Sequence, residues 1–214
     1  MPLNELIIIG AGRHALETYF LVNDLEYAPK IIGFVQDEVE SGDEIMGKPL
    51  ISTSGILSNY ATSKKPLLLG AIGNITDNKR LIETFKTAGF NFFSAIPKSI
   101  IIERQKFIGE GITIASGTIL TTNISVGNYS IINIGCNISH DVTIGQYVNI
   151  SPGANIAGNV NIEDEVFIGS GVTIIPKISI GKGSVIAAGA CVIKDVPPYS
   201  LAAGVPAIVK KYLK

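Results

Sequence analysis

Residues 126–156 read VGNYSIINIGCNISHDVTIGQYVNISPGANI, and an aliphatic residue returns at every sixth position of this stretch. Counting by six from Ile138 reaches Ile102 in one direction and Val192 in the other without interruption. We call these aliphatic residues the anchors of the repeat. A second series of residues, mostly small or β-branched, stands two positions before each anchor, as Cys136 stands before Ile138. A period of six is typical of a parallel β-helix, in which each hexad supplies a short strand and a turn. Three hexads would close one triangular coil, so the stretch predicts about five coils around an aliphatic interior.

Glycine recurs one position after several of these anchors. The positions are Gly109, Gly127, Gly145, Gly169 and Gly181. Because glycine tolerates backbone angles that other residues avoid, we expect these five positions to form tight turns with unusual dihedral angles.

The residues before the repeat have the rhythm of an α/β fold. Apolar runs predict strands over 6–9, 31–35, 67–72 and 91–95, and helical spacing predicts helices over 14–25 and 77–88, the second capped by Asp77. This order implies a small parallel sheet with helices over it. We therefore predict an α/β domain over 1–97, a β-helix domain over 98–197, and a C-terminal cap or arm over 198–214.

Composition narrows the class of protein. The chain has 214 residues, 46% of them hydrophobic and 16% charged, so it can bury a core. Its net charge of −1 argues against a general electrostatic grip on nucleic acid or anionic lipid. No apolar stretch reaches the length of a membrane span, and the N-terminus lacks the basic region of a signal peptide, so we expect a cytoplasmic protein. Two cysteines make no disulfide framework and no zinc motif.

The repeat contains a single histidine, His140, which is followed by Asp141. These positions are two and three after the anchor Ile138, where side chains should point outward. An outward imidazole suits general-base chemistry near neutral pH, and a neighbouring carboxylate can orient the ring and stabilise its cation. Cys136 falls in the inward series and is expected to be a packed thiol. A solvated surface pair is the alternative reading of His140 and Asp141.

A second candidate site lies in the N-terminal half. Gly10-Ala11-Gly12-Arg13-His14-Ala15 follows a predicted strand and opens a helix, a pattern that suits phosphate binding at the helix N-terminus. Asp37 follows the second strand and Gly73 the third. Because the carboxyl ends of parallel strands share one edge of a sheet, these loops should meet there. The sheet is short, which favours a mononucleotide or nucleotide-sugar ligand over a dinucleotide.

The whole chain resembles the bacterial sugar acetyltransferases of the PglD and sialic acid O-acetyltransferase type. The resemblance is carried by 10–15, Ser139-His140-Asp141, the 157–160 stretch AGNV, and 204–207, which read GVPA. It implies a Rossmann-like α/β N-terminal subdomain followed by a left-handed parallel β-helix, assembled as a homotrimer with its active site between subunits. It also implies acetyl-CoA as the acetyl donor, a nucleotide-linked amino sugar as the acceptor, and no metal.

The resemblance also assigns roles to residues. It implies that His140 is the catalytic base and Asp141 its acidic partner. For the substrate it points to Gly12, Arg13, His14, Gln36, Asp37, Gly73 and Asn133. For the cofactor it points to Asn149, Gly158, Ser170 and Ala188. Gln36 departs from an acidic residue of the family, and Asn149 stands where a relative has a histidine near the CoA thiol.

The function expected from these observations is N-acetylation of a UDP- or dTDP-linked 4-amino-4,6-dideoxy sugar by direct transfer from acetyl-CoA. O-acetylation of sialic acid or another sugar hydroxyl is the alternative within enzymes. A non-catalytic nucleotide-sugar-binding trimer and a nicotinamide-dependent oxidoreductase are alternatives from other classes. A γ-type carbonic anhydrase is excluded, because its zinc needs several histidines and the repeat holds one.

Overall fold

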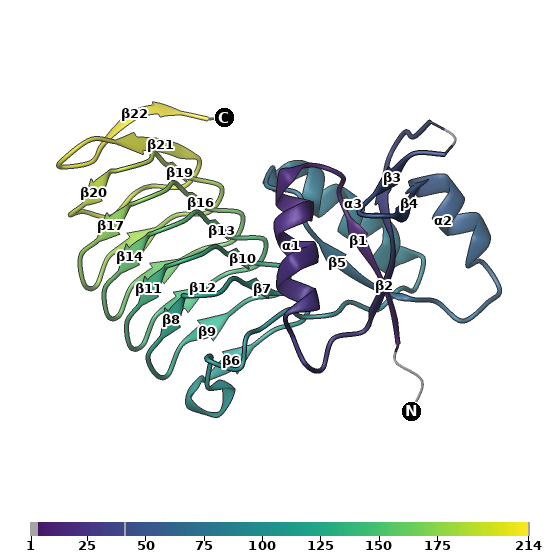
Figure 1. The fold of residues 1–214 in the computed structure, drawn as a ribbon. Coiled ribbons are helices and arrows are strands. Elements are labelled where there is room, and N and C mark those ends of the chain that lie inside the picture. The colour runs from purple at the N-terminus through teal and green to yellow at the C-terminus, as the bar shows by residue number, and fades with distance from the viewer. Residues whose placement is uncertain (1–3, 41, 214) are drawn as a thin grey trace. The chain divides into compact units, whose positions relative to one another are not determined.

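The protein is described by a computed structural model that covers residues 4–40 and 42–213. It divides into two compact units, Met1–Ala95 and Ile96–Lys214. Figure 1 shows an α/β unit at the N-terminal, purple and blue end of the chain and a stack of strands in its green and yellow part.

The first unit is an α/β fold built on a five-stranded sheet in the order β3-β4-β2-β1-β5. Its elements in chain order are β1 (Glu5–Ile9), α1 (Arg13–Asn23), β2 (Lys30–Gln36), β3 (Glu44–Ile45), β4 (Lys48–Ser52), α2 (Thr53–Asn59), β5 (Leu67–Gly70) and α3 (Ile75–Thr87). Strand β1 pairs in parallel with β2 and β5, and β2 pairs in parallel with β4. The apolar run 6–9 is fully buried at the centre of this sheet.

Several details of this unit differ from the sequence prediction. The run 91–95 forms no strand, although Phe92 makes an isolated parallel bridge to Leu68. Between the predicted strands 31–35 and 67–72, where the sequence analysis placed no element, the structure has the antiparallel pair β3–β4 and helix α2. Helix α3 is capped by Asn74, whose side chain accepts a hydrogen bond from the Asp77 backbone, so Asp77 was the wrong cap. Both side chains suit an N-cap, but the helix begins at Ile75, two residues earlier than predicted, so Asp77 lies inside its first turn.

The second unit is a left-handed parallel β-helix of two-residue strands (Figure 1). Paired strands lie eighteen residues apart, as in Asn137 with Asn155 and Ile138 with Ile156. The predicted coil of three hexads is therefore confirmed. Each coil contributes one strand to each of three sheets, within which the hexad strands run parallel, and the sheets form the sides of the triangle.

The β-helix has one seven-stranded sheet and two five-stranded sheets, which we call the β8 sheet and the β6 sheet after their first strands. The seven-stranded sheet holds β7 (Thr113–Ile114), β10 (Ile131–Ile132), β13 (Asn149–Ile150), β16 (Phe167–Ile168), β19 (Val185–Ile186), β21 (Ser200–Ala203) and β22 (Ile208–Tyr212). The β8 sheet holds β8 (Ile119–Leu120), β11 (Asn137–Ile138), β14 (Asn155–Ile156), β17 (Thr173–Ile174) and β20 (Cys191–Val192). The β6 sheet holds β6 (Phe107–Ile108), β9 (Ser125–Val126), β12 (Thr143–Ile144), β15 (Asn161–Ile162) and β18 (Ser179–Ile180).

Both inward series of the repeat fill the interior of this unit. Every anchor from Ile114 to Val192 is buried, and so is the second series from Thr118 to Ala190. The polar members of the second series satisfy their hydroxyl groups on backbone carbonyls: Ser130, for example, donates to Gly145 O at 2.9 Å. Cys136 is fully buried among them, so the predicted packed thiol is confirmed.

Two predictions about the repeat were wrong. Counting by six places the first anchor at Ile102, but this residue begins a short 3-10 helix (Ile102–Arg104) and is 48% exposed. The glycines that follow anchors have ordinary dihedral angles. These positions have no room for a side chain because the next coil is close: a Cβ on Gly145 would lie 2.6 Å from the Asp164 backbone nitrogen. The left-handed residues lie elsewhere in the turns, and Gly135 and Asp141 are examples.

The stack continues past the end of the hexad repeat. Strand β21 pairs in parallel with β19, and β22 folds back on it in the antiparallel direction. The side chains of β22 are exposed.

Candidate active site

His140 and Asp141 lie in a turn of the β-helix that connects β11 to β12. We call the stack of equivalent turns (121–124, 139–142, 157–160 and 175–178) the His140 corner. The side chain of His140 is 57% exposed and that of Asp141 is 41% exposed, so both point outward as predicted. Nδ1 of His140 lies 2.7 Å from Oδ2 of Asp141. An imidazole bound through Nδ1 to a carboxylate presents Nε2 for proton transfer.

The backbone of the turn sets the position of the Asp141 carboxylate. Asp141 adopts the left-handed conformation, with φ 60°. Its Oδ1 accepts a hydrogen bond from the side-chain amide of Asn123, one coil earlier in the same corner. The hydrogen bond from His140, with a further one from Asn123, holds the pKa of Asp141 below its usual range, and the charges of His140 and Lys106 act in the same direction. Asp141 is therefore a carboxylate at neutral pH.

Gly158 lies against the imidazole, one coil later in the corner. A Cβ built on Gly158 would lie 2.6 Å from Cε1 of His140 and 2.7 Å from Nε2. The absence of a side chain at this position leaves the space that the ring occupies. The backbone N–H of the following residue, Asn159, donates to the His140 carbonyl at 3.0 Å.

Three other predicted site residues lie at a different corner of the β-helix, where the seven-stranded sheet passes into the β8 sheet. We call it the Ser170 corner. Asn133, Ser170 and Ala188 are in its turns, and both Ser170 and Ala188 are exposed. Asn133 uses its Oδ1 to accept the backbone N–H of Ile134 at 3.0 Å. One β-helix therefore presents the proposed base and these residues on two separate corners.

Asn149 lies in neither corner. It is the first residue of β13, and only 7% of it is exposed in this chain.

The N-terminal candidates follow the ends of β1, β2 and β5. Gly10 has φ +124°, and a Cβ there would lie 2.9 Å from Ala71 O, so this glycine is required by the turn. Gly12 is the N-cap of α1 and has open space around it. Arg13 is exposed in the first turn of α1. His14 is partly buried and bonds Glu17 at 3.3 Å through Nδ1, while its Nε2 is buried without a partner in the described residues.

Asp37, directly after β2, is bound by an arginine that the sequence analysis missed. Arg80 of α3 makes a bidentate ion pair with the Asp37 carboxylate, and Thr53 donates to its Oδ1 at 3.2 Å. The Arg80 hydrogen bond lowers the pKa of Asp37 against the effect of partial burial. The neighbouring Gln36 donates to the Glu38 carbonyl at 2.7 Å.

Gly73, in the loop between β5 and α3, has open space where a side chain would stand. The ends of β1, β2 and β5 are in register: Ile9 pairs with Val35 on one side and with Gly70 on the other. The predicted substrate loops of this unit therefore share one edge of the sheet. Arg80 and Thr53 reach the same edge from helices that carry no recognisable motif, which is why spacing alone did not identify them.

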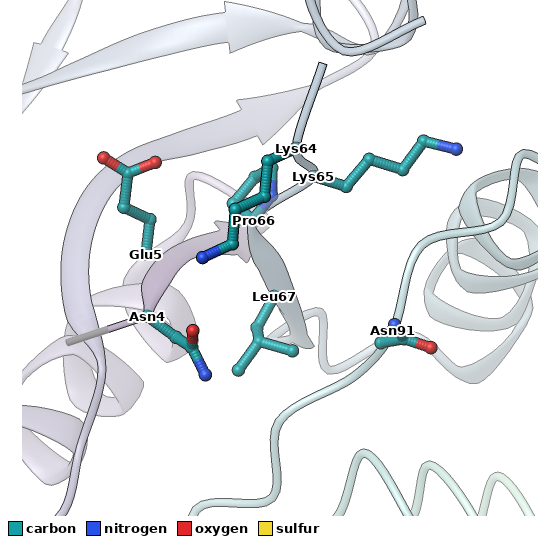
Figure 2. A pocket seen from close by; sticks show the side chains of 7 residues that line it. All are labelled: Asn4, Glu5, Lys64, Lys65, Pro66, Leu67 and Asn91. Atoms are coloured by element: carbon teal, nitrogen blue, oxygen red, sulfur yellow. The ribbon is translucent and has the colours of Figure 1, made fainter. Parts of the chain in front are cut away.

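A pocket of about 440 Å³ lies at the opposite ends of these strands. Figure 2 shows its lining, in which Glu5 opens β1 and Leu67 opens β5, with Lys64, Lys65 and Asn91 around them. Lys65 is already engaged, since it donates to Ala88 O at 2.6 Å and lies over the Phe90 ring. None of the predicted site residues lines this pocket.

Two features are absent from residues 4–40 and 42–213. No helix among them is both long and apolar enough to cross a bilayer. No three of their His, Cys, Asp and Glu side chains group together as metal ligands would.

The fold and the corner histidine define a hexapeptide-repeat protein with a left-handed β-helix. The bacterial transferase hexapeptide family (six repeats) matches residues 159–194. Within this class, the chain resembles the bacterial sugar acetyltransferases of the PglD type over its whole length. No curated protein sequence matches it.

Three solved structures illustrate the likeness. A histidine-to-asparagine mutant of perosamine N-acetyltransferase from Caulobacter crescentus, in complex with CoA and GDP-perosamine, is 26% identical with a TM-score of 0.87, covering 97% of each chain. The acetyltransferase domain of PglB from Neisseria gonorrhoeae is 26% identical with a TM-score of 0.86, covering 96% of this chain and 99% of its own. WeeI from Acinetobacter baumannii is 28% identical with a TM-score of 0.81, covering 95% and 98%.

Proposed function

We propose that this protein is an acetyl-CoA-dependent N-acetyltransferase that acts on the 4-amino group of a nucleotide-linked 4-amino-4,6-dideoxy sugar. The observation that carries the proposal is the exposed His140 imidazole, bound through Nδ1 to the Asp141 carboxylate at 2.7 Å on the outside of a hexapeptide β-helix. Structural relatives support the substrate class, because perosamine N-acetyltransferase binds CoA and GDP-perosamine.

The proposed chemistry is direct transfer. The sugar amine attacks the thioester carbonyl carbon, forming a C–N bond and a tetrahedral intermediate with negative charge on oxygen. Nε2 of His140 takes the proton from the amine, and Asp141 stabilises the imidazolium. The C–S bond then breaks, and the thiolate leaves with that proton as CoA. The products are the N-acetylated nucleotide sugar and free CoA.

The surroundings of His140 support this assignment of roles. The backbone N–H of Gly158, the residue against which the ring packs, is the donor that we propose for the oxyanion. Cys136 is unsuited to covalent catalysis, because burial raises the pKa of its thiol and places it in the core.

The edge of the first unit that carries Gly12, Asp37 and Gly73 is proposed to hold the nucleotide. The open space at Gly12 and Gly73 would let a phosphate approach the backbone. We propose that Arg13, His14, Gln36 and Arg80 contribute to the same region. Acetyl-CoA and nucleotide sugars are cytoplasmic metabolites, so an enzyme that uses both is expected in the cytoplasm.

The cofactor is proposed to lie along the β-helix, with Asn149, Gly158, Ser170 and Ala188 contributing to its site. A homotrimer is proposed as the assembly. This is because Gly158 lies at the His140 corner while Ser170 and Ala188 lie at another, and a threefold arrangement could bring one corner of a subunit beside the other corner of its neighbour.

The test is release of free thiol from acetyl-CoA with a panel of UDP-, dTDP- and GDP-linked 4-amino sugars. We expect turnover with one of them, and a loss of at least about 10²-fold in His140→Ala if the ring is the base. Asn161→Ala, an exposed strand residue of the β6 sheet, is the control and should keep full activity.

Two results would contradict the proposal. Full activity in His140→Ala would show that His140 is not the catalytic base. Turnover with sialic acid or another hydroxyl acceptor, and with none of the amino sugars, would replace N-acetylation by O-acetylation.

A further inference from the structure

Asn123 occupies a special place in the His140 corner. Asn123, Asp141 and Asn159 are equivalent residues of three successive coils, and all three are left-handed, with φ of 56°, 60° and 60°. The backbone N–H of Asp141 donates to the carbonyl of Thr122 at 3.2 Å, so the backbones of the first two turns are stacked. Asn123 therefore stands directly before Asp141 in the ladder of turns.

The Asp141 carboxylate receives a different donor on each oxygen. Oδ1 accepts from the side-chain amide of Asn123, and Oδ2 lies 2.7 Å from Nδ1 of His140. With Oδ1 held by the neighbouring coil, the carboxylate cannot rotate freely. Its other oxygen is then directed at the imidazole.

We propose that Asn123 is a positioning residue: its amide fixes the Asp141 carboxylate so that Oδ2 accepts the Nδ1–H of His140 and Nε2 is left unprotonated. The inference rests on the proposed function for its catalytic meaning, but its structural content stands apart from any substrate. A series of hydrogen bonds thus runs from Asn123 through Asp141 to His140. It spans two coils and ends at the ring whose Nε2 accepts the proton.

The charges around Asp141 agree with this arrangement. An amide donates to Oδ1 without adding a negative charge, so Asp141 can remain ionised and serve as an acceptor. Among the charged groups, His140 and Lys106 favour the ionised form of Asp141, with the His140 and Asn123 hydrogen bonds acting in the same direction. A protonated Asp141 would compete as a donor, and these groups oppose it.

A simpler explanation for an asparagine at position 123 is the left-handed backbone conformation of the turn. Asparagine is enriched in the left-handed conformation, so it could be present for the turn alone. Asn159 separates the two explanations. It has the same residue type and conformation in the coil after Asp141, and its side-chain amide makes no hydrogen bond within the described part of the chain.

The test compares Asn123→Gly with Asn159→Gly in the full-length protein. Glycine accepts a positive φ, so both variants remove an amide without straining the turn. Asn123→Asp is the second variant: it keeps the shape of the side chain, but an ionised carboxylate cannot donate to Asp141. Thermal unfolding shows that each variant is folded.

The readout is the tautomer of His140, from ¹⁵N NMR of the histidine rings at a pH where they are neutral. The chain has two histidines, so the His140 signals are assigned by their loss in His140→Ala. We expect the Nδ1–H form to dominate in the wild type and in Asn159→Gly. Both Asn123 variants should shift toward the mixture of a free imidazole.

Turnover is measured alongside. In both Asn123 variants kcat should fall about tenfold, a part of what general-base catalysis supplies, with KM for acetyl-CoA unchanged. An unchanged tautomer in the Asn123 variants, or an equal change in Asn159→Gly, overturns the proposal. If the tautomer shifts as expected but the wild type acetylates no amino sugar, the positioning role stands and the proposed function fails.

Discussion

The contact between Gly158 and His140 makes the smallest substitution a sharp test of the site. A methyl group at residue 158 would stand 2.6 Å from Cε1 of His140, and the half-exposed ring can move outward to relieve this contact. We therefore expect Gly158→Ala to fold normally but to lose about tenfold or more in kcat, because the proposed base leaves its position.

A double-mutant cycle identifies the route of this effect. If Gly158→Ala acts through the ring, it should add little to His140→Ala, because the two substitutions disable the same group. Independent, multiplying losses in the double variant would instead mean that Gly158 acts mainly on the cofactor. Steady-state kinetics of the two single variants and the double variant decide between these cases.

The Asp37–Arg80 pair predicts how the first unit responds to acid. The native pKa of Asp37 is lowered by Arg80, so the pair stabilises the fold above the unfolded-state value and loses this contribution as pH falls through the native value. Because both side chains are about half exposed, we expect at most about 1 kcal/mol at pH 7.

Urea titrations of the wild type and Asp37→Asn would measure this contribution. The difference in free energy of unfolding should be present at pH 7 and should shrink by pH 3. A difference that is the same at both values would show that the pair does not stabilise the native state through the charge of Asp37.

The strands and turns show which features of this fold can be predicted from the sequence. The coils of the β-helix could be predicted from the six-residue period. Every anchor from Ile114 to Val192 is aliphatic and needs burial, and a coil of three hexads places all of them in the interior. At Ile102 the six-residue pattern continues in the sequence, but the chain there forms a 3-10 helix, which the aliphatic spacing alone does not distinguish from a strand. The pair β3–β4 was missed because β3 is only two residues long, too short for a periodic signal.

The arrangement of the candidate site was predictable where one chain segment carries it. His140 and Asp141 are adjacent, so the outward positions of a hexad identify both. Asn123 and Arg80 were not identifiable, because each meets its partner through tertiary structure: Asn123 across one coil and Arg80 across 43 residues. Neither spacing nor residue type marks them in the sequence.

At the scale of elements, the close stacking of coils predicts different costs for two glycines. A Cβ on Gly145 would meet the backbone of the next coil at 2.6 Å, and a stacked backbone cannot yield as a side chain can. We expect Gly145→Ala to destabilise the protein by about 1–3 kcal/mol. Gly73→Ala is the stability control, because the space around it is open, and it should change stability by less than about 0.5 kcal/mol.

Thermal unfolding of the two glycine variants would test this difference. Equal stability of Gly145→Ala and the wild type would mean that the coils can separate locally, contrary to the continuous ladder of hydrogen bonds between them.

For the whole molecule, the separation of the two corners leads to a prediction about assembly. A trimer of the 22.6 kDa chain would have a mass of roughly 68 kDa in light scattering, three times the chain mass. If each site takes the His140 corner from one subunit and the Ser170 corner from the next, a subunit defective at one corner can complement a subunit defective at the other.

Co-expression of His140→Ala with Ala188→Glu tests whether the sites are shared. Each variant alone should be inactive, the first for lack of a base and the second because a charged side chain blocks the exposed Ser170 corner. In a mixed trimer of either composition, one of three sites joins an intact His140 corner to an intact Ser170 corner. Random mixing makes three quarters of trimers mixed, so about a quarter of wild-type activity should return. Mixed trimers without activity would mean that each site uses two corners of a single subunit, with the cofactor crossing the β8 sheet.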